Sequence, residues 1–189
     1  VLDTDSVFHG VDRVTDDAAS VVPPVRPTTV LVHRGDRWDL VDDDGDVVSD
    51  HALMYNGPLL YLGGHETTVN LIGNGSYALL DHRDQLERLV ADPSLDANAV
   101  EELLRYDSPV QFSRRIALEP IEVAGQVVAP GEFVMTCLGA ANRDPLKFGP
   151  TAAELDLGRP DAREHVSFGS GVHHCLGAAL ARLEGQEVI

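Results

Sequence analysis

The sequence is poor in cysteine, in basic residues and in long apolar runs. Its 189 residues include only two cysteines, Cys137 and Cys175, which cannot supply the four thiolates of an iron–sulfur cluster or of a Cys₄ zinc site. The 14 Lys and Arg residues are outnumbered by 31 Asp and Glu residues, for a formal net charge of −17. A charge of that sign repels the phosphates of nucleic acids and of anionic lipids. We therefore expect no nucleic-acid partner.

Nothing in the sequence indicates export or a membrane. No stretch approaches the roughly 18 uninterrupted apolar residues of a membrane span, and residues 1–5 have neither a basic n-region nor an apolar h-region. We expect a soluble, cytoplasmic protein without membrane association. Hydrophobic residues make up 43% of the chain, which is enough apolar surface for the core of one domain.

The composition changes near residue 50. Residues 1–50 hold 12 acidic and 4 basic residues, a net charge of −8, and include the acidic run 42–46. Such a segment buries little apolar surface, so we predict an acidic, partly irregular leader over 1–48 and a folded domain over 49–189. A solvated leader is the favoured interpretation of the charge, ahead of an acidic docking tail.

Helical patterns dominate after the leader. Ser49 or Asp50 can cap a first helix. Pro58 lacks a helical donor, at a cost of about 3 kcal/mol, and Gly63 and Gly64 loosen the turn that follows, so we expect this helix to be kinked or locally opened. Further helices are expected over 77–90, over 97–106 and from about 176 to the end.

A short β region lies between these helices. Beyond Pro109 the apolar residues alternate with polar ones, and Ala124-Gly125 and Pro130-Gly131 are turn signals. The pattern predicts a small set of antiparallel hairpins. The fold class is therefore mainly α with a small β part.

The segment that carries chemistry is the glycine-rich stretch before the last helix. Cys175 follows this stretch at the start of the helix, where free N–H groups and the helix dipole favour a thiolate, which is a metal ligand. Gly169, Gly171 and Gly177 let the backbone pass close to a flat partner and leave amides free to donate to the sulfur. This arrangement suits a haem iron.

Three other interpretations of this segment remain open. His173, His174 and Cys175 could be zinc ligands, although adjacent residues point in divergent directions and no second pair lies at zinc-finger spacing. A phosphate-binding loop lacks the Gly-Lys-Ser/Thr that it needs. Taken alone, the cysteine could also be a buried structural residue behind a glycine-rich turn.

The string Phe168-x-x-Gly171-x-x-x-Cys175-x-Gly177 resembles the haem-binding signature of the cytochrome P450 family. Other stretches upstream are similar to family motifs and occur in the family's order: Gly63-Gly64-His65-Glu66-Thr67, Glu102-Leu103-Leu104-Arg105, Arg114-Arg115-Ile116-Ala117-Leu118 and Ala141-Asn142-Arg143-Asp144-Pro145. The resemblance covers about residues 42–189 and implies a partial cytochrome P450 fold.

The resemblance implies a role for each matching residue. Cys175 would be the proximal ligand of the iron of haem b, and its electron donation would favour cleavage of a bound O–O bond. Glu66 and Thr67 would be catalytic residues that relay protons on the distal side.

Other matching residues would hold the haem or the fold. Arg115 and His173 would contact the haem propionates, Phe168 would pack near the proximal face of the ring, and Gly169 and Gly177 would belong to the same cofactor-binding set. Glu102 and Arg105 could be a local ion pair worth about 0.2–0.5 kcal/mol; in the family they would join a buried network with the loop before the cysteine.

The function that the resemblance implies is that of a monooxygenase. It would insert one oxygen atom from O₂ into a small organic substrate, with electrons from a ferredoxin-type or flavoprotein donor. Family members are longer, so we expect this chain to be a truncated, C-terminal part. The alternatives are a non-catalytic remnant and a helical binding or interaction module.

Overall fold

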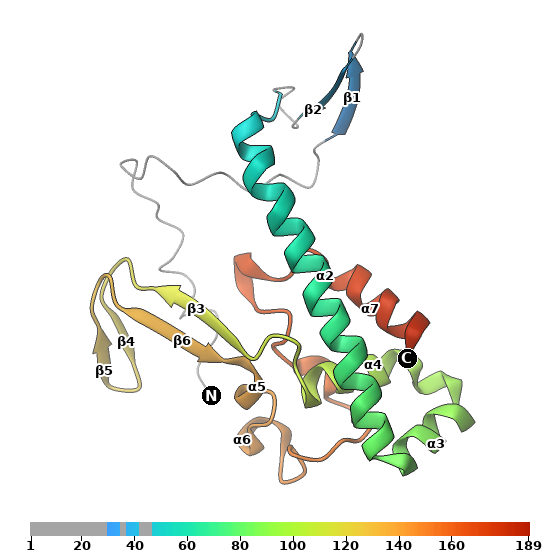
Figure 1. Ribbon diagram of the computed structural model, residues 1–189. Coiled ribbons are helices and arrows are strands. Elements are labelled where there is room, and N and C mark those ends of the chain that lie inside the picture. The colour runs from blue at the N-terminus through green and yellow to red at the C-terminus, as the bar shows by residue number, and fades with distance from the viewer. Residues whose placement is uncertain (1–29, 35–36, 42–46) are drawn as a thin grey trace. The chain divides into compact units, whose positions relative to one another are not determined.

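The structure, a computed structural model, describes residues 30–34, 37–41 and 47–189 (Figure 1). The described residues belong to two compact units, one ending at His65 and the other running from Glu66 to Ile189. Each unit is described by itself below. The predicted leader falls largely outside the described residues, since these omit 1–29, 35–36 and the acidic run 42–46.

The unit that ends at His65 contains a β-hairpin. Strands β1 (Val30–Arg34) and β2 (Arg37–Val41) pair antiparallel, with Val30 opposite Val41. The sequence analysis predicted no strand in this region. Helix α2 (Asp50–Asp81) begins soon afterwards, and the Ser49 hydroxyl accepts a hydrogen bond from the Ala52 amide at 3.2 Å. Of the two predicted helix caps, Ser49 is therefore the one that forms.

Helix α2 is continuous over 32 residues, through Pro58 and both glycines that follow it. These residues predict a kinked or locally opened helix, and the local opening does not form. Proline removes one hydrogen bond, and in a helix of this length the turns on either side keep theirs. None of the described helices, α2 included, is both long enough and apolar enough to span a bilayer.

The first break in the helical region falls at His82 and not before residue 77. There the ring nitrogen Nδ1 lies 2.9 Å from the carbonyl oxygen of Ala78, so the side chain takes up a carbonyl at the end of α2. The predicted helix 77–90 is consequently divided between the end of α2 and α3 (Arg83–Ala91). Helix α4 (Asp96–Tyr106) follows the short 3₁₀ turn η1 (Pro93–Leu95) and confirms the helix predicted over 97–106 to within a residue.

The strands of residues 66–189 form two separate two-stranded sheets. Strands β4 (Ile121–Val123) and β5 (Gln126–Val128) make the predicted hairpin, turning through Ala124 and Gly125, which both have positive φ. The Pro130-Gly131 turn makes no hairpin, because β6 (Phe133–Cys137) pairs with β3 (Phe112–Ile116) and not with β5. The remaining elements are α5 (Leu138–Ala141), α6 (Pro145–Phe148), η2 (Ala162–Glu164), η3 (Gly171–His173) and α7 (Ala178–Val188).

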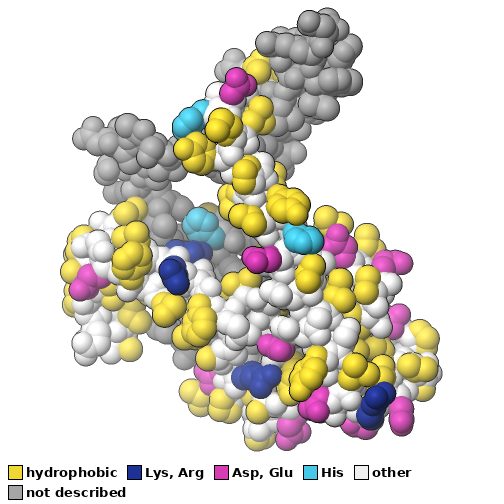
Figure 2. Space-filling view, in the orientation of Figure 1, with side chains coloured by type: hydrophobic (Ala, Val, Ile, Leu, Met, Phe, Trp, Pro, Cys, Tyr) yellow, Lys and Arg dark blue, Asp and Glu magenta, His cyan; other side chains and the backbone are white. Residues whose placement is uncertain are grey.

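This architecture confirms the fold class predicted from the sequence, mainly α with a small β part. Several hydrophobic side chains are nevertheless exposed. Figure 2 shows many of them along the first half of α2, where Met54, Leu59 and Tyr61 are more than half exposed. In the other unit, Phe112 and Phe133 are exposed on the β3–β6 sheet. Exposed apolar surface of this kind is typical of contact surfaces.

The core of residues 66–189 lies where α2, α4 and α7 meet. Its buried members are Leu71, Ala78, Leu79, Leu89, Ala99, Val100, Leu103, Leu104, Leu155 and Leu157. Gly185 of α7 permits the close approach of the three helices. A Cβ atom there would lie 3.0 Å from Cγ1 of Val100 and 3.3 Å from Cδ2 of Leu71. The helices pack at a distance that only glycine allows without a shift of its neighbours.

We predict that Gly185→Val destabilises the protein by about 1–3 kcal/mol, because the added side chain overpacks the contact with Val100 and Leu71. The matched control is Gly73→Val on α2. No atom lies within 4 Å of the position of its Cβ, so this substitution should change stability by no more than about 0.5 kcal/mol. Urea unfolding followed by circular dichroism measures both. Equal effects of the two substitutions would contradict the packing described here.

Candidate functional site

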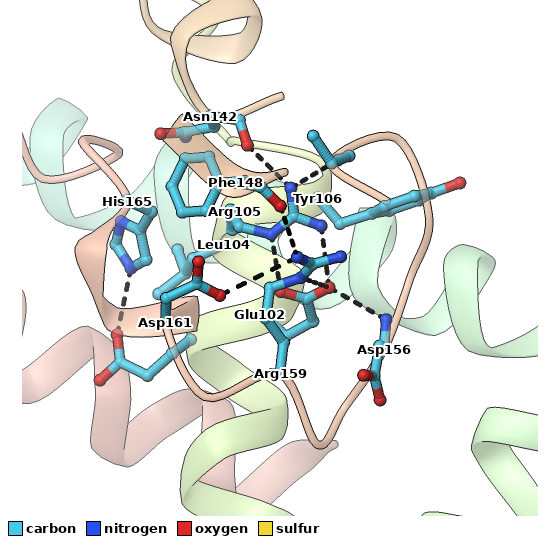
Figure 3. Close-up of polar contacts among 12 residues, drawn as sticks. Glu102, Leu104, Arg105, Tyr106, Asn142, Phe148, Asp156, Arg159, Asp161 and His165 are labelled. Atoms are coloured by element: carbon cyan, nitrogen blue, oxygen red, sulfur yellow. Dashed lines mark hydrogen bonds and ion pairs between the residues drawn. The ribbon is translucent and has the colours of Figure 1, made fainter. Parts of the chain in front are cut away.

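A buried ion pair anchors the region of the predicted site. Glu102 and Arg105 lie one turn apart on α4, and both side chains are fully buried (Figure 3). Arg105 Nε donates to Oε2 of Glu102 at 2.7 Å, and Nη2 donates to Oε1 at 2.8 Å. The pair is bidentate and excluded from water, unlike the exposed local pair that the spacing alone would explain.

The remaining donors of Arg105 reach an irregular segment of the chain. Nη1 donates to the carbonyl oxygens of Asn142 and Ala152 at 2.8 and 2.7 Å, and Nη2 donates to that of Glu154 at 2.9 Å. Arg159 joins the same carboxylate, with its Nε 3.2 Å from Oε1 of Glu102. The buried network expected from the family resemblance is therefore present, and it extends to Arg159, which the sequence analysis did not name.

Asn142 connects this network to the segment before the cysteine. Its carbonyl oxygen binds Arg105, as described, while its side-chain oxygen accepts from the Val166 amide at 2.8 Å. Its Nδ2 donates to Oγ of Ser167 at 2.7 Å, and that hydroxyl in turn donates to the Leu104 carbonyl oxygen at 2.7 Å. The chain is thus fixed on α4 immediately before the glycine-rich segment.

Residues 168–175 form a closed loop. The Cys175 amide donates to the Phe168 carbonyl oxygen at 2.8 Å, and Gly169 turns the chain with a φ of 70°, a conformation that disfavours any side chain. Helix α7 starts at Ala178, two residues later than predicted, so Cys175 lies in the turn before it. The thiol is exposed, so the interpretation of Cys175 as a buried structural cysteine is wrong.

Five of the eight predicted site residues lie in the loop or directly after it, within residues 168–177: Phe168, Gly169, His173, Cys175 and Gly177. His173 is exposed in η3. A Cβ on Gly177 would lie 3.9 Å from Sγ of Cys175, which is an ordinary contact distance. The Phe168 ring packs against the core, and the guanidinium carbon of Arg182 lies 4.6 Å from the ring centroid.

The other three predicted residues come from separate elements. Glu66 is exposed and Thr67 is partly buried, both on α2. The next residue, Thr68, donates from Oγ1 to Oε2 of Glu184 at 3.2 Å, which ties α2 to α7. Arg115 is partly buried on β3, where its Nη1 donates to Oγ of Ser113 and to the Arg114 carbonyl oxygen, both at 2.8 Å.

Glu101 is a buried acid that the sequence analysis missed. Its carboxylate is 1% exposed and pairs with His165 at 3.0 Å, with Arg182 at 2.7 Å and with Arg163 at 3.2 Å. Burial raises the pKa of Glu101, but the hydrogen bonds from His165 and Arg182 and the charge of Arg182 together outweigh it and lower the pKa to about 2. The sequence does carry a signal for this acid: two adjacent acidic residues lie inside a helix with an apolar pattern, so at least one of them faces the core. A buried acid needs a partner, which predicts a basic residue beside it.

Comparison with known proteins agrees with this arrangement. A family model described as "Cytochrome P450" matches residues 93–188, which include the Glu102–Arg105 network and the Cys175 loop. The chain belongs to the cytochrome P450 family.

Two curated relatives and one solved structure illustrate the similarity. A vitamin D(3) 25-hydroxylase of Pseudonocardia autotrophica is 52% identical over 149 residues, which cover 78% of this chain and 36% of the relative. The cytochrome P450 monooxygenase PikC of Streptomyces venezuelae is 45% identical over 146 residues, with coverages of 77% and 35%. The crystal structure of P450BioI in complex with a fatty-acid-ligated acyl carrier protein aligns with a TM-score of 0.71 and 46% identity, covering 75% of this chain and 36% of that one. The chain thus spans about a third of the length of these relatives.

The residues around Cys175 fit the haem that a cytochrome P450 carries. A haem iron already holds four porphyrin nitrogens and takes a single thiolate from the protein, and Cys175 offers one exposed sulfur. Val172, three residues before it, and Leu176, directly after it, are exposed apolar side chains suited to a flat apolar ring. Among residues 30–34, 37–41 and 47–189, no three His, Cys, Asp or Glu side chains are grouped to hold a metal ion, so the zinc interpretation has no ligand set there.

We predict that Arg105→Met in this P450 chain lowers the free energy of unfolding by about 3–5 kcal/mol, because it leaves the Glu102 carboxylate buried with too few partners. The matched control is Arg88→Met. The ion pair of Arg88 with Asp156 is about half exposed, so its loss should cost no more than about 1 kcal/mol. Chemical unfolding of both variants tests the difference, and a small effect of Arg105→Met would contradict the role given to the buried pair.

The lowered pKa of Glu101 predicts that the stability of the fold depends on pH. Its pKa is lower in the folded protein than the ordinary value of 4.5, so its carboxylate stabilises the fold fully above about pH 4.5, and this stabilisation is lost as the pH falls toward about 2. The contribution at neutral pH is of order 3 kcal/mol. The difference in unfolding free energy between the wild-type chain and Glu101→Gln should therefore shrink steadily below about pH 4.5. A difference that stays constant over this range would contradict the assignment.

Proposed function

We propose that this chain carries the haem-thiolate site of a monooxygenase that inserts one oxygen atom from O₂ into a small organic substrate. The observation that supports this most directly is the exposed Cys175 sulfur, held at the end of a loop that is tied to a buried network. The proposal includes haem b as the cofactor, a ferredoxin-type or flavoprotein electron donor and a cytoplasmic location. Two relatives are named as a hydroxylase and a monooxygenase, in line with this chemistry.

Cys175 supplies the ligand in this proposal. Its position just before α7 puts the sulfur close to the N-terminal end of that helix. The hydrogen bond from its amide to the Phe168 carbonyl oxygen fixes the backbone that carries the sulfur. Bound haem supplies oxygen activation, and a thiolate ligand donates electron density that favours cleavage of the O–O bond.

Glu66 and Thr67 manage protons in the proposed reaction. The Glu66 carboxylate is exposed on α2 and can exchange protons with solvent. The hydroxyl of the adjacent, partly buried Thr67 can pass a proton inward from that carboxylate. In the proposal the acid and the adjacent hydroxyl both handle protons from the same stretch of α2.

Arg115 and His173 orient the cofactor in the proposal. The bonds of Arg115 Nη1 to Ser113 and Arg114 hold a cation in place on β3, and a fixed cation suits a propionate. His173 is exposed in the cysteine loop and offers a ring N–H donor. Phe168 packs against the core at the start of the loop, and Gly169 makes the turn with a φ of 70°. Gly177 keeps a side chain away from the sulfur, since a Cβ there would lie 3.9 Å from Sγ of Cys175.

The ligand assignment can be tested by absorption spectroscopy. The full chain is expressed with a haem precursor, reduced and exposed to carbon monoxide. We expect the wild-type chain and Cys137→Ser to give the band of thiolate-ligated ferrous haem, and Cys175→Ser to lose it, because only the sulfur of Cys175 would reach the iron. Cys137 is the matched control, since it is the other exposed cysteine.

Three results would count against the proposal. A Cys175→Ser spectrum identical to that of the wild-type chain would remove the ligand assignment. Absence of haem binding by the wild-type chain would instead favour the helical interaction module. Haem binding without electron uptake or turnover with any ferredoxin system would favour the non-catalytic remnant.

A further inference from the structure

The carboxylate of Glu101 reaches the cysteine loop by two separate routes. Through Oε2 it contacts Nε2 of His165 at 3.0 Å, and through Oε1 it accepts from Nε of Arg182 at 2.7 Å. His165 precedes the loop and Arg182 follows it on α7. The single carboxylate therefore holds both ends of the segment that contains Cys175.

The first route fixes the tautomer and the orientation of the imidazole. The Ser167 amide lies 3.1 Å from Nδ1 of His165. An amide N–H can only donate, so Nδ1 accepts and Nε2 carries the hydrogen that Glu101 receives. Glu101 thereby orients a ring whose other nitrogen binds the backbone of Ser167, the residue just before Phe168.

The second route passes through an aromatic ring. Arg182 binds both oxygens of Glu101, the second through Nη2 at 3.3 Å, and its guanidinium lies over the face of Phe168 at 4.6 Å from the ring centroid. The His165 and Phe168 rings are also in contact, with centroids 5.5 Å apart. Phe168 is therefore held from both sides, and its carbonyl oxygen is the acceptor for the Cys175 amide.

The adjacent Glu102 serves a different part of the chain. Its contacts are with Arg105, Arg159 and the Asp156 amide, and none of these residues belongs to the loop 168–175. The contacts of Glu101 are with residues 163, 165 and 182. Two neighbouring acids on α4 thus act on two separate segments.

We propose that Glu101 is a positioning residue for the Cys175 loop and acts through His165 and Arg182 to set the place of the sulfur. The inference rests on the proposed function in so far as that sulfur is a haem ligand. Its geometry can nevertheless be tested in the haem-free chain.

The experiment measures amide hydrogen exchange in the full chain. The measured quantity is the exchange rate of the Cys175 amide divided by that of the Ala117 amide, which donates to the Glu132 carbonyl oxygen outside the loop. The Glu101→Gln variant keeps the shape of the side chain and removes its charge. The control is Leu89→Ala, which removes a buried core side chain on α3 and destabilises the chain without touching the loop.

We expect Glu101→Gln to raise this ratio by about tenfold or more, because the loop opens locally. Leu89→Ala should leave the ratio within about twofold of the wild-type value, because a global loss of stability affects both amides. A ratio in Glu101→Gln that matches the ratio in Leu89→Ala would overturn the proposal, since Glu101 would then be merely structural.

A double-mutant cycle tests the route through the imidazole. In His165→Asn the new side chain can still accept from the Ser167 amide as an Asx turn, without help from Glu101. The effect of Glu101→Gln on the exchange ratio should therefore be several-fold smaller in this background. Full additivity of the two substitutions would show that Glu101 does not act through His165 and would overturn that route.

The haem-loaded protein gives a second measurement. The reduced carbon monoxide complex of Glu101→Gln should contain a smaller fraction of the thiolate-ligated form than that of Leu89→Ala. If the wild-type chain shows no thiolate band, the proposed function fails while the exchange ratio still tests the positioning role. If the wild-type band is present and neither the band nor the ratio changes in Glu101→Gln, only the positioning role fails.

Discussion

The burial of the Arg105 guanidinium is the constraint on which the rest of residues 66–189 depends. A cation without exposure to water is tolerable only when all of its donors are matched, because its desolvation costs several kcal/mol. One carboxylate and three backbone carbonyls from residues 142, 152 and 154 provide the match. The segment that carries these carbonyls has little regular structure of its own. Its path is set by the requirement to present them to a single side chain on α4.

Helix α4 contacts different segments of the chain on its different sides. Residues 99–105 are buried without interruption, so the helix has no solvent-facing side over that length. Successive residues of a helix are rotated by about 100°, and the adjacent acids Glu101 and Glu102 accordingly contact different segments. One holds residues 163, 165 and 182, and the other holds residues 105, 156 and 159. The loop of Cys175 is thus tied to a helix that is itself fixed on all sides.

Local signals in the sequence predicted local structure well. The Ala124-Gly125 turn, the Ser49 cap and helix α4 each depend on neighbouring residues, and each forms. Pairing of β6 with β3 depends on contacts between distant residues and was missed. The end of α2 at His82, where the ring lies 2.9 Å from the Ala78 carbonyl oxygen, was missed although that contact is local. The same division holds in the site. Five of its predicted residues share one short segment, whereas the partners of Glu101 lie 64 and 81 residues away in the chain, where no local pattern indicates them.

The Cys175 thiol is exposed, whereas the contacts that hold its loop in place are buried. In the proposed function this sulfur meets a cofactor and has to stay accessible, so it cannot be fixed by packing around itself. The loop is fixed instead beneath the thiol. There the Arg182 guanidinium stacks on the Phe168 ring, and the Phe168 carbonyl oxygen accepts a hydrogen bond from the Cys175 amide. The glycine-rich motif supplies the turn and the free space. Helix α4, from a distant part of the sequence, supplies the position, so a chain with the motif and without that helix would carry the same cysteine in an undefined place.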